Sequence, residues 1–263
     1  MPTICVCVEP FFGKISLAEK ARKVAALGFR AFEFWSCEGG PERDLGALAA
    51  AGTETGLVLN DFGVSARGVA LVNAGDREKY LEGLRRTIQV AKEMNCRKLL
   101  TTTGNAIEGR LREDQHQAIV GTLKAAAPIA AAEGITVLLE PLNSLVDHRG
   151  YYLDSGHEGA QIIEEVGSAA VRLLWDIYHM QIMHGNVLAD IKRYLPLIGH
   201  FHSAGVPGRH ELNVGELNYS NILADIKAWG YEGCFGLEYW PVGDDHIASL
   251  AETRRLTAAA GWE

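Results

Sequence analysis

The sequence predicts an α/β fold, a closed (β/α)8 barrel with parallel strands. Apolar runs of strand length alternate with longer stretches of helical period along the 263 residues of the chain. Eight such pairs can be counted, and the strands must be parallel because each intervening helix returns the chain to the same end of the sheet. Eight units in roughly 250 residues are typical of this barrel. We therefore expect residues 1–263 to form a single domain.

Four βα units are expected in the first half of the chain. The helix at 17–27 stops at Gly28 and the helix at 45–55 stops at Gly56, since helices commonly end at a glycine. The strand at 97–103 is rich in β-branched residues, which favour extended backbone. The expected strands are 3–9, 29–35, 57–61 and 97–103, and the expected helices are 17–27, 45–55, 77–95 and 113–133.

The second half continues the alternation without a linker or a low-complexity segment. A doubly wound open sheet is the alternative architecture, but neither GxGxxG nor a Walker loop follows any strand, so its usual nucleotide signal is missing. The expected strands are 135–140, 170–176, 197–203 and 234–238, and the expected helices are 158–166, 187–194, 219–229 and 247–260.

Composition narrows the classes of protein. Hydrophobic residues make up 48% of the chain, enough for a large globular core. The first residues lead straight into an apolar run, with no basic leader and no apolar span of about 20 residues, so we expect a cytoplasmic protein without a membrane partner. The five cysteines are scattered, which argues against disulfides and cysteine zinc sites. A net charge of −8 repels polyanions, so a small molecule is the expected partner rather than a nucleic acid.

Polar side chains occupy the ends of the last four expected strands, where (β/α)8 barrels carry their active sites. Glu140, Asp176, His202 and Glu238 follow one another at intervals of about one βα unit, so they stand on four neighbouring strands. Because side chains alternate along a strand, each shares its face with the residue two positions earlier. A ring of three carboxylates and one imidazole is the result.

This ring favours a divalent metal site. Three converging carboxylates would repel one another and raise one another's pKa unless a cation neutralised them. One nitrogen and three oxygens suit Mn²⁺, Mg²⁺ or Co²⁺ in an open octahedral site. Each residue alone is more often structural, and Asp176, directly after an apolar strand, could simply cap a helix. All four residues occupy corresponding positions at the ends of their strands, and this favours a metal site over four separate structural roles.

Six short segments carry a family resemblance: LEPLN at 139–143, WDIYH at 175–179, MQIMHGN at 180–186, VPGRHE at 206–211, GELNY at 215–219 and LEY at 237–239. Together they resemble the hydroxypyruvate isomerase branch of the xylose-isomerase-like barrels, and the resemblance runs over nearly the whole chain. It implies that Glu140, Asp176, His202 and Glu238 bind a metal, and that Glu140 and Glu238 also transfer protons.

By the same resemblance, His179 and Arg209 would hold substrate oxygens, and the guanidinium could bind a substrate carboxylate bidentately. One residue departs from the pattern. His202 stands where close hydroxypyruvate isomerases usually carry glutamine, and a histidine here is similar to the ketose 3-epimerases. A D-tagatose or D-psicose 3-epimerase is therefore the alternative to the isomerase.

The chemistry can also be argued from the residues. Moving a carbonyl along a carbon chain, or inverting the carbon beside it, requires removal of an α proton and stabilisation of an enediolate. Glu140 and Glu238 could remove and return that proton while a metal bridges adjacent oxygens. We therefore expect a metal-assisted isomerase of a small keto or hydroxy sugar or sugar acid that works through a cis-enediolate.

Two other classes are less favoured. An AP-endonuclease-like nuclease would need a basic surface and a richer histidine cluster than these nine dispersed histidines. A non-catalytic sugar-binding barrel would need carboxylates that hold no metal. Among further residues, Glu33 could belong to a buried network as easily as to the site and is expected to be structural, Glu9 and Asn60 could line the pocket, and Trp35 and Phe11 could form apolar walls. The helix at 113–133 is expected to pack on the outside, where a homo-oligomer surface is one option.

Overall fold

The eight strands form a closed β-barrel in sequence order in the computed structural model, which describes residues 2–263. On β1, Cys5 lies opposite Ala31 of β2 on one side and opposite Gly236 of β8 on the other, both in parallel register. The predicted fold class is confirmed. The strands are β1 (Thr3–Cys7), β2 (Ala31–Ser36), β3 (Val58–Gly63), β4 (Lys98–Thr101), β5 (Thr136–Leu139), β6 (Val171–Asp176), β7 (Ile198–Ser203) and β8 (Cys234–Leu237).

Helices α1 and α2 begin at caps that the sequence supplies. At α1, the Ser16 hydroxyl accepts from the backbone N–H of Glu19, and the Glu19 carboxylate accepts from that of Ser16. At α2, Asp44 caps the start, and Gly56 ends the helix with a φ of 71°. No helix within residues 2–263 is both long and apolar enough to cross a bilayer. The α-helices are α1 (Leu17–Ala26), α2 (Leu45–Thr55), α3 (Arg77–Glu93), α4 (Arg112–Ala132), α5 (Gly156–Val166), α6 (Ile177–Met183), α7 (Val187–Tyr194), α8 (Tyr219–Ala228) and α9 (His246–Ala259), and the short 3-10 helices are η1 (Pro41–Arg43), η2 (Ala74–Asp76) and η3 (Leu195–Leu197).

One helix was missed by the sequence analysis. The seven-residue helix α6 follows β6 without a loop, and Asp176 is both the last residue of the strand and the N-cap of the helix. The prediction of eight helices was wrong here, because so short a helix shows no readable period behind an apolar strand. Two strands also end one residue early, so that Glu140 and Glu238 directly follow β5 and β8.

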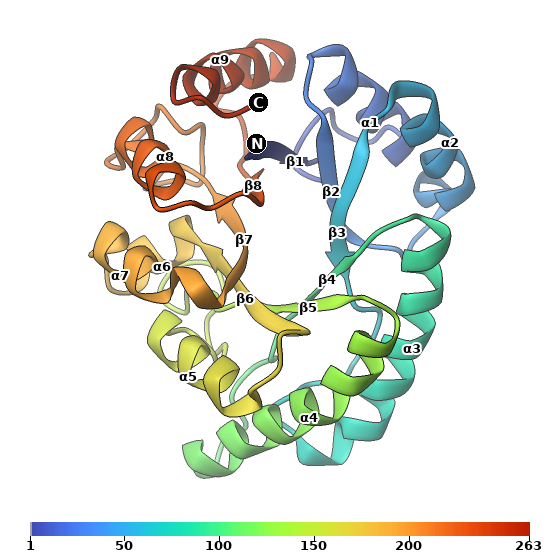
Figure 1. Ribbon diagram of the computed structural model, residues 1–263, viewed down its shortest axis with the longest axis vertical. Coiled ribbons are helices and arrows are strands. Elements are labelled where there is room, and N and C mark those ends of the chain that lie inside the picture. The colour runs from blue at the N-terminus through green and yellow to red at the C-terminus, as the bar shows by residue number, and fades with distance from the viewer. Residues whose placement is uncertain (1) are drawn as a thin grey trace. The chain divides into compact units, whose positions relative to one another are not determined.

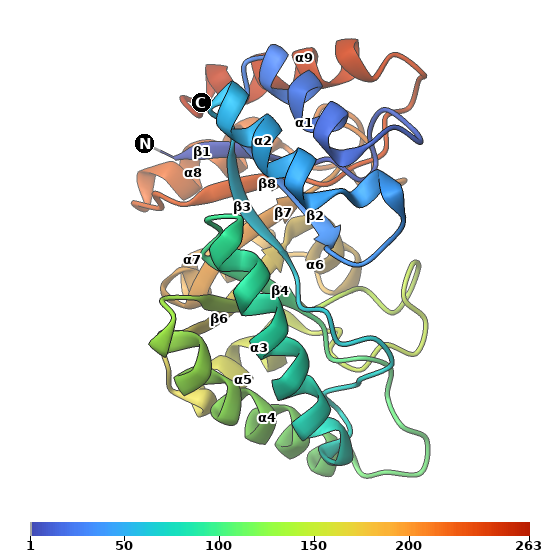
Figure 2. The ribbon, with the colours of Figure 1, turned by 90° about the vertical axis from the view of Figure 1, so that its right-hand side faces the viewer.

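The chain divides into two compact units. The first contains the described residues up to Phe62, Asn186–Leu195 and His200–Glu263, and the second contains Gly63–Gly185 and Pro196–Gly199. In the first unit, α1 and α2 lie side by side near β2 (Figure 1). In the second, α3, α4 and α5 run next to one another (Figure 2). The single domain expected from the sequence stays a prediction.

The strand that leads to Asp176 is packed tightly. Trp175 on β6 is fully buried, and its ring reaches the first turn of α5 at Gly156. A Cβ atom at Gly156 would lie 2.6 Å from the Trp175 ring, so only glycine fits there without a shift. The end of β6 is therefore a rigid support for the carboxylate that follows.

Glu158 ties α5 to α4 in the second unit. Its carboxylate accepts from the Tyr152 hydroxyl at 2.7 Å, lies 3.2 Å from Nδ1 of His116, and pairs with Arg112. Burial alone would raise the pKa of Glu158, but hydrogen bonds from Tyr152, Arg112 and His116 outweigh it and lower the pKa below its ordinary value. The ionised form is therefore the one that stabilises the fold.

Replacing Glu158 by Gln should remove a stabilising contact that depends on pH. The pKa of Glu158 is lower in the folded than in the unfolded protein. Its contribution to the free energy of unfolding is therefore complete above the unfolded-state pKa of about 4.3, and it is lost as the pH falls through the folded-state pKa. Urea unfolding at pH 7 should show a free energy of unfolding about 1–3 kcal/mol lower in Glu158→Gln than in the parent. This difference between variant and parent should become smaller toward pH 3. Glu113→Gln, at an exposed position on α4, is the control and should change little. An equal difference between parent and Glu158→Gln at both pH values would contradict a stabilising role of the ionised carboxylate.

Candidate active site

The ends of β7 and β8 bring two of the predicted ligands together in the first unit. His202 and Glu238 are buried, and Nδ1 of His202 lies 3.3 Å from Oε2 of Glu238. Strand register explains this, because His202 pairs with Gly236, two residues before Glu238 on the same face. Two ligands at right angles around a metal, each about 2.1 Å from it, stand about 3.0 Å apart. The spacing of His202 and Glu238 is close to that value.

Glu238 is held as an ionised carboxylate. The indole Nε1 of Trp35 donates to its Oε1, and Nη2 of Arg209 donates to its Oε2. Burial alone would raise the pKa of Glu238, but the positive charge of Arg209 and the hydrogen bond from Trp35 hold it well below its usual range. The carboxylate is therefore ionised, which is the form that binds a cation.

Arg209 and Trp35, the two partners of Glu238, both lie near Trp240. The Arg209 guanidinium lies over Trp240, 5.1 Å from the ring centroid, and the Trp240 ring is 6.0 Å from that of Trp35. Both indoles are about 40% exposed. Sequence reasoning predicted Trp35 as an apolar wall and missed its hydrogen bond to Glu238, because nothing in the sequence relates these two positions. The substrate contact predicted for Arg209 stays a prediction.

Glu140 and Asp176 form a second pair of predicted ligands, within the second unit. Both are buried, and each offers a carboxylate oxygen within 4.8 Å of the other's. Their strands β5 and β6 run parallel, with Leu139 opposite Leu173. The backbone of Glu140 is fixed on both sides, since its N–H donates to Thr101 at 3.1 Å and its carbonyl accepts from the Tyr151 hydroxyl at 3.1 Å.

The two oxygens of Asp176 have different neighbours. Oδ1 accepts from the backbone N–H groups of Tyr178 at 2.8 Å and His179 at 3.3 Å, as an N-cap does. Oδ2 lies 3.4 Å from Nε2 of His179. The capping and metal-binding interpretations are therefore compatible, because the cap uses only Oδ1.

His179 is fixed in one tautomer. It is fully buried, and its Nδ1 accepts from the backbone N–H of Asn143 at 3.2 Å and lies 2.7 Å from the side-chain nitrogen of the same residue. Since a backbone N–H can only donate, Nδ1 carries no proton, and the ring carries it on Nε2, toward Asp176. Asn143 lies in the LEPLN segment, but nothing in the sequence pairs it with His179. The substrate contact predicted for His179 stays a prediction.

Glu33 on β2 joins His202 to a buried cluster in the first unit. Its Oε1 lies 3.0 Å from Nε2 of His202, and its Oε2 lies 2.8 Å from Nε2 of His200. Burial alone would raise the pKa of Glu33, but His202 and His200 hold it well below its usual range. These three side chains also offer ligand atoms within 4.8 Å of one another. The buried network expected around Glu33 is present.

The other strand residues named from the sequence have structural partners. Glu9 pairs with Arg43 at 2.6 Å, and Asn60 donates to Asp61 at 2.6 Å. Phe11 is fully buried and meets Tyr239 edge to face, so it packs inside the first unit instead of lining an open wall.

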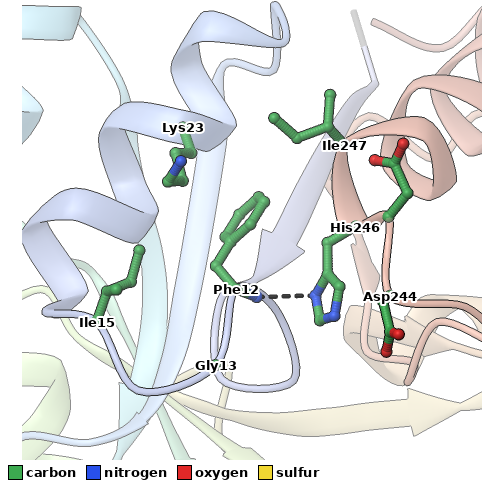
Figure 3. Close-up of a pocket in the computed structure, with 8 residues that line it drawn as sticks. Phe12, Gly13, Ile15, Lys23, Asp244, His246 and Ile247 are labelled. Carbon is green, nitrogen blue, oxygen red and sulfur yellow. Dashed lines mark hydrogen bonds between the residues drawn. The ribbon is translucent and has the colours of Figure 1, made fainter.

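A separate pocket of about 510 Å³ opens in the first unit (Figure 3). The backbone N–H of Phe12 donates to Nδ1 of His246 across it, at 2.8 Å. None of the predicted site residues lines it, so it does not belong to the candidate active site. Its lining residues are Phe12, Gly13, Ile15, Lys23, Asp244, Asp245, His246 and Ile247.

Comparison with known proteins identifies the family. The 2-oxo-tetronate isomerase of Cupriavidus necator is 32% identical over 245 residues, 92% of this chain and 94% of that protein. The hydroxypyruvate isomerase of Escherichia coli is 30% identical over 234 residues, 88% of this chain and 90% of that protein. The crystal structure of an AP endonuclease, family 2, from Brucella melitensis matches with a TM-score of 0.89 at 27% identity, over 97% of this chain and 99% of that one. The family model described as a xylose isomerase-like TIM barrel matches residues 21–258, and the chain therefore belongs to that family.

Proposed function

We propose that this protein is an isomerase of a small keto acid, which moves the carbonyl to the neighbouring carbon through a cis-enediolate with the help of one divalent cation. One observation carries the proposal. Four buried acid and histidine side chains, with a donor set that suits such a cation, stand at or directly after the ends of four strands that are consecutive in the barrel order. Two relatives of similar length, named for the isomerisation of keto acids, support the substrate class.

The residues assigned to the cation are Glu140, Asp176, His202 and Glu238. Their three carboxylates and one imidazole favour Mn²⁺, Mg²⁺ or Co²⁺ over zinc. Within each unit the two ligands of a pair approach each other closely enough to share an ion, at 3.3 Å in one pair and within 4.8 Å in the other. When bound, the cation would stabilise negative charge on the substrate oxygens.

Glu140 and Glu238 are assigned to proton transfer. Enediolate chemistry needs one group to take the proton from the α carbon and a group to deliver a proton to the adjacent carbon. Both glutamates are buried and fixed, Glu238 by Trp35 and Arg209, and Glu140 through its backbone. Two carboxylates at the ends of different strands can approach a small substrate from two sides.

Arg209 is assigned to the substrate carboxylate. Its guanidinium already binds a carboxylate, that of Glu238, while its flat face rests on Trp240. A carboxylate on the substrate would offer the same charge-assisted hydrogen bonds. This favours a keto acid over a neutral ketose.

A ketose 3-epimerase is the second candidate. His202 favours it, because the sequence resemblance places histidine at this position in such enzymes and glutamine in close hydroxypyruvate isomerases. Both reactions use the same proton transfer and differ in the carbon that is reprotonated. A cytoplasmic location and a homo-oligomer stay predictions.

Asp176→Asn tests the cation site. Asparagine caps helices about as well as aspartate, so α6 and the stability of the fold should be kept while a charged ligand is lost. After chelation and reloading with Mn²⁺, the bound metal measured by atomic absorption should fall well below that of the parent. Asp44→Asn makes the same change at the N-cap of α2 and should leave the metal content unchanged. Equal metal in Asp176→Asn and the parent would contradict the site.

Glu140→Gln and Glu238→Gln test proton transfer. Each should lower kcat by about 10²–10⁴-fold, since an amide cannot accept the proton, while circular dichroism shows a retained fold. Assays at saturating Mn²⁺ separate this loss from weaker metal binding. Glu211→Gln is the control, because Glu211 is buried in the loop after β7 and accepts from Ser249. Parent-like turnover in either site variant would remove that residue from the mechanism.

Arg209→Met tests whether the substrate is a keto acid or a neutral ketose. Loss of the charged contact should raise KM for hydroxypyruvate about tenfold or more and leave KM for a neutral ketose near that of the parent. Arg193→Met removes another guanidinium that lies 5.1 Å from an aromatic ring, that of Tyr194, and should change neither value. An unchanged KM for hydroxypyruvate would argue for the epimerase.

A further inference from the structure

The contact between Glu33 and His202 gives Glu33 a part in cation binding. We propose that Glu33 is a positioning residue that holds the imidazole of His202 with its proton on Nε2 and so leaves Nδ1 for the divalent cation. The inference rests on the proposed function, since it needs a cation at His202. It goes further because it assigns a role to a residue outside the four ligands.

The two nitrogens of His202 face two different carboxylates. Nε2 is 3.0 Å from Oε1 of Glu33, and Nδ1 is 3.3 Å from Oε2 of Glu238. A neutral imidazole presents an N–H on one side and a lone pair on the other. Glu238 already accepts from Arg209 and Trp35, and the contact with Glu33 is the shorter of the two. On these two distances we place the proton on Nε2, which lies nearer to a carboxylate, and this leaves the lone pair of Nδ1 on the side of Glu238.

Glu33 can orient His202 because it is itself held in place. Its second oxygen, Oε2, accepts from the Cys5 thiol at 3.1 Å and lies 2.8 Å from Nε2 of His200. Nδ1 of His200 donates to the Cys234 carbonyl at 3.0 Å, which fixes the ring. Glu33 and His200 are both almost fully buried. The other oxygen, Oε1, lies 3.0 Å from Nε2 of His202.

The backbone of β8 is shaped around this contact. A Cβ atom at Gly236 would lie 2.6 Å from Oε1 of Glu33 and 2.7 Å from Cδ2 of His202. Any side chain there would push against both partners at once. The glycine thus leaves room for the two side chains to meet.

Metal-binding histidines commonly donate their other N–H to a carboxylate, and loss of such a partner typically weakens metal binding about 10–100-fold. Glu33 is the carboxylate in this position, next to Nε2 of His202. Its carboxylate would keep the ring from turning and would make Nδ1 a better donor to the cation.

A double-mutant cycle on Mn²⁺ affinity tests the role. By isothermal titration calorimetry of metal-free protein, Glu33→Gln should weaken Mn²⁺ binding about 10–100-fold, and the control Glu211→Gln should not. In a His202→Gln background the ligand is an amide with no tautomer to set, so Glu33→Gln should add almost nothing. If Glu33→Gln weakened Mn²⁺ binding equally in the parent and in the His202→Gln protein, its effect would be a general structural one, and the positioning role of Glu33 would be overturned.

A second readout does not depend on the Glu33 variant folding or on metal. Long-range ¹H–¹⁵N spectra of the metal-free parent, labelled with ¹⁵N-histidine and assigned with His202→Gln, should show His202 protonated on Nε2. A proton on Nδ1 would overturn the inference. Absence of Mn²⁺ binding by the parent would overturn the proposed function together with this role, whereas binding that Glu33→Gln leaves unchanged would overturn this role alone.

Discussion

Buried negative charge is the constraint on which the candidate site depends. An ionised carboxylate that leaves water costs several kcal/mol unless donors or cations compensate it. Glu238 is compensated by Arg209 and Trp35, and Glu33 by His200 and Cys5. Asp176 receives the first N–H groups of α6. These fixed donors hold each acid in one orientation, and in our proposal the remaining compensation comes from the divalent cation.

Rigid strands hold these side chains in place. Parallel pairing sets His202 beside Gly236 and Leu139 beside Leu173, so the polar residues that follow leave their strands at defined positions. Packing then fixes the strands, as where the Trp175 ring occupies the space that Gly156 leaves open. A preorganised set of donors of this kind can stabilise developing charge without rearranging during the reaction.

Local patterns in the sequence were enough to predict the barrel, the bounds of α2 and α7, and the ends of β6 and β7, which carry Asp176 and His202. Glu140 and Glu238 lie one residue beyond their strands. Local patterns could not reveal α6, which is too short to show a period. They also could not reveal that Asp176 caps this helix with one oxygen. The partners of Glu238 and His202 were missed for a different reason, because Trp35 and Glu33 lie on β2, far away along the chain, and only the closed sheet brings them near.

The central proposal is that two buried glutamates carry a proton between neighbouring carbons of a keto acid. The most direct measurement is NMR of hydroxypyruvate incubated with the Mn²⁺-loaded protein in D₂O, against an enzyme-free control, with neutral ketohexoses tested in parallel. We predict that deuterium appears at the former keto carbon of the product as the carbonyl moves, and at the hydroxymethyl carbon of hydroxypyruvate when the enediolate is reprotonated in reverse. Deuterium at C3 of a ketohexose alone would identify an epimerase. The absence of both deuterium and isomerised product with every substrate would contradict the proposed proton transfer.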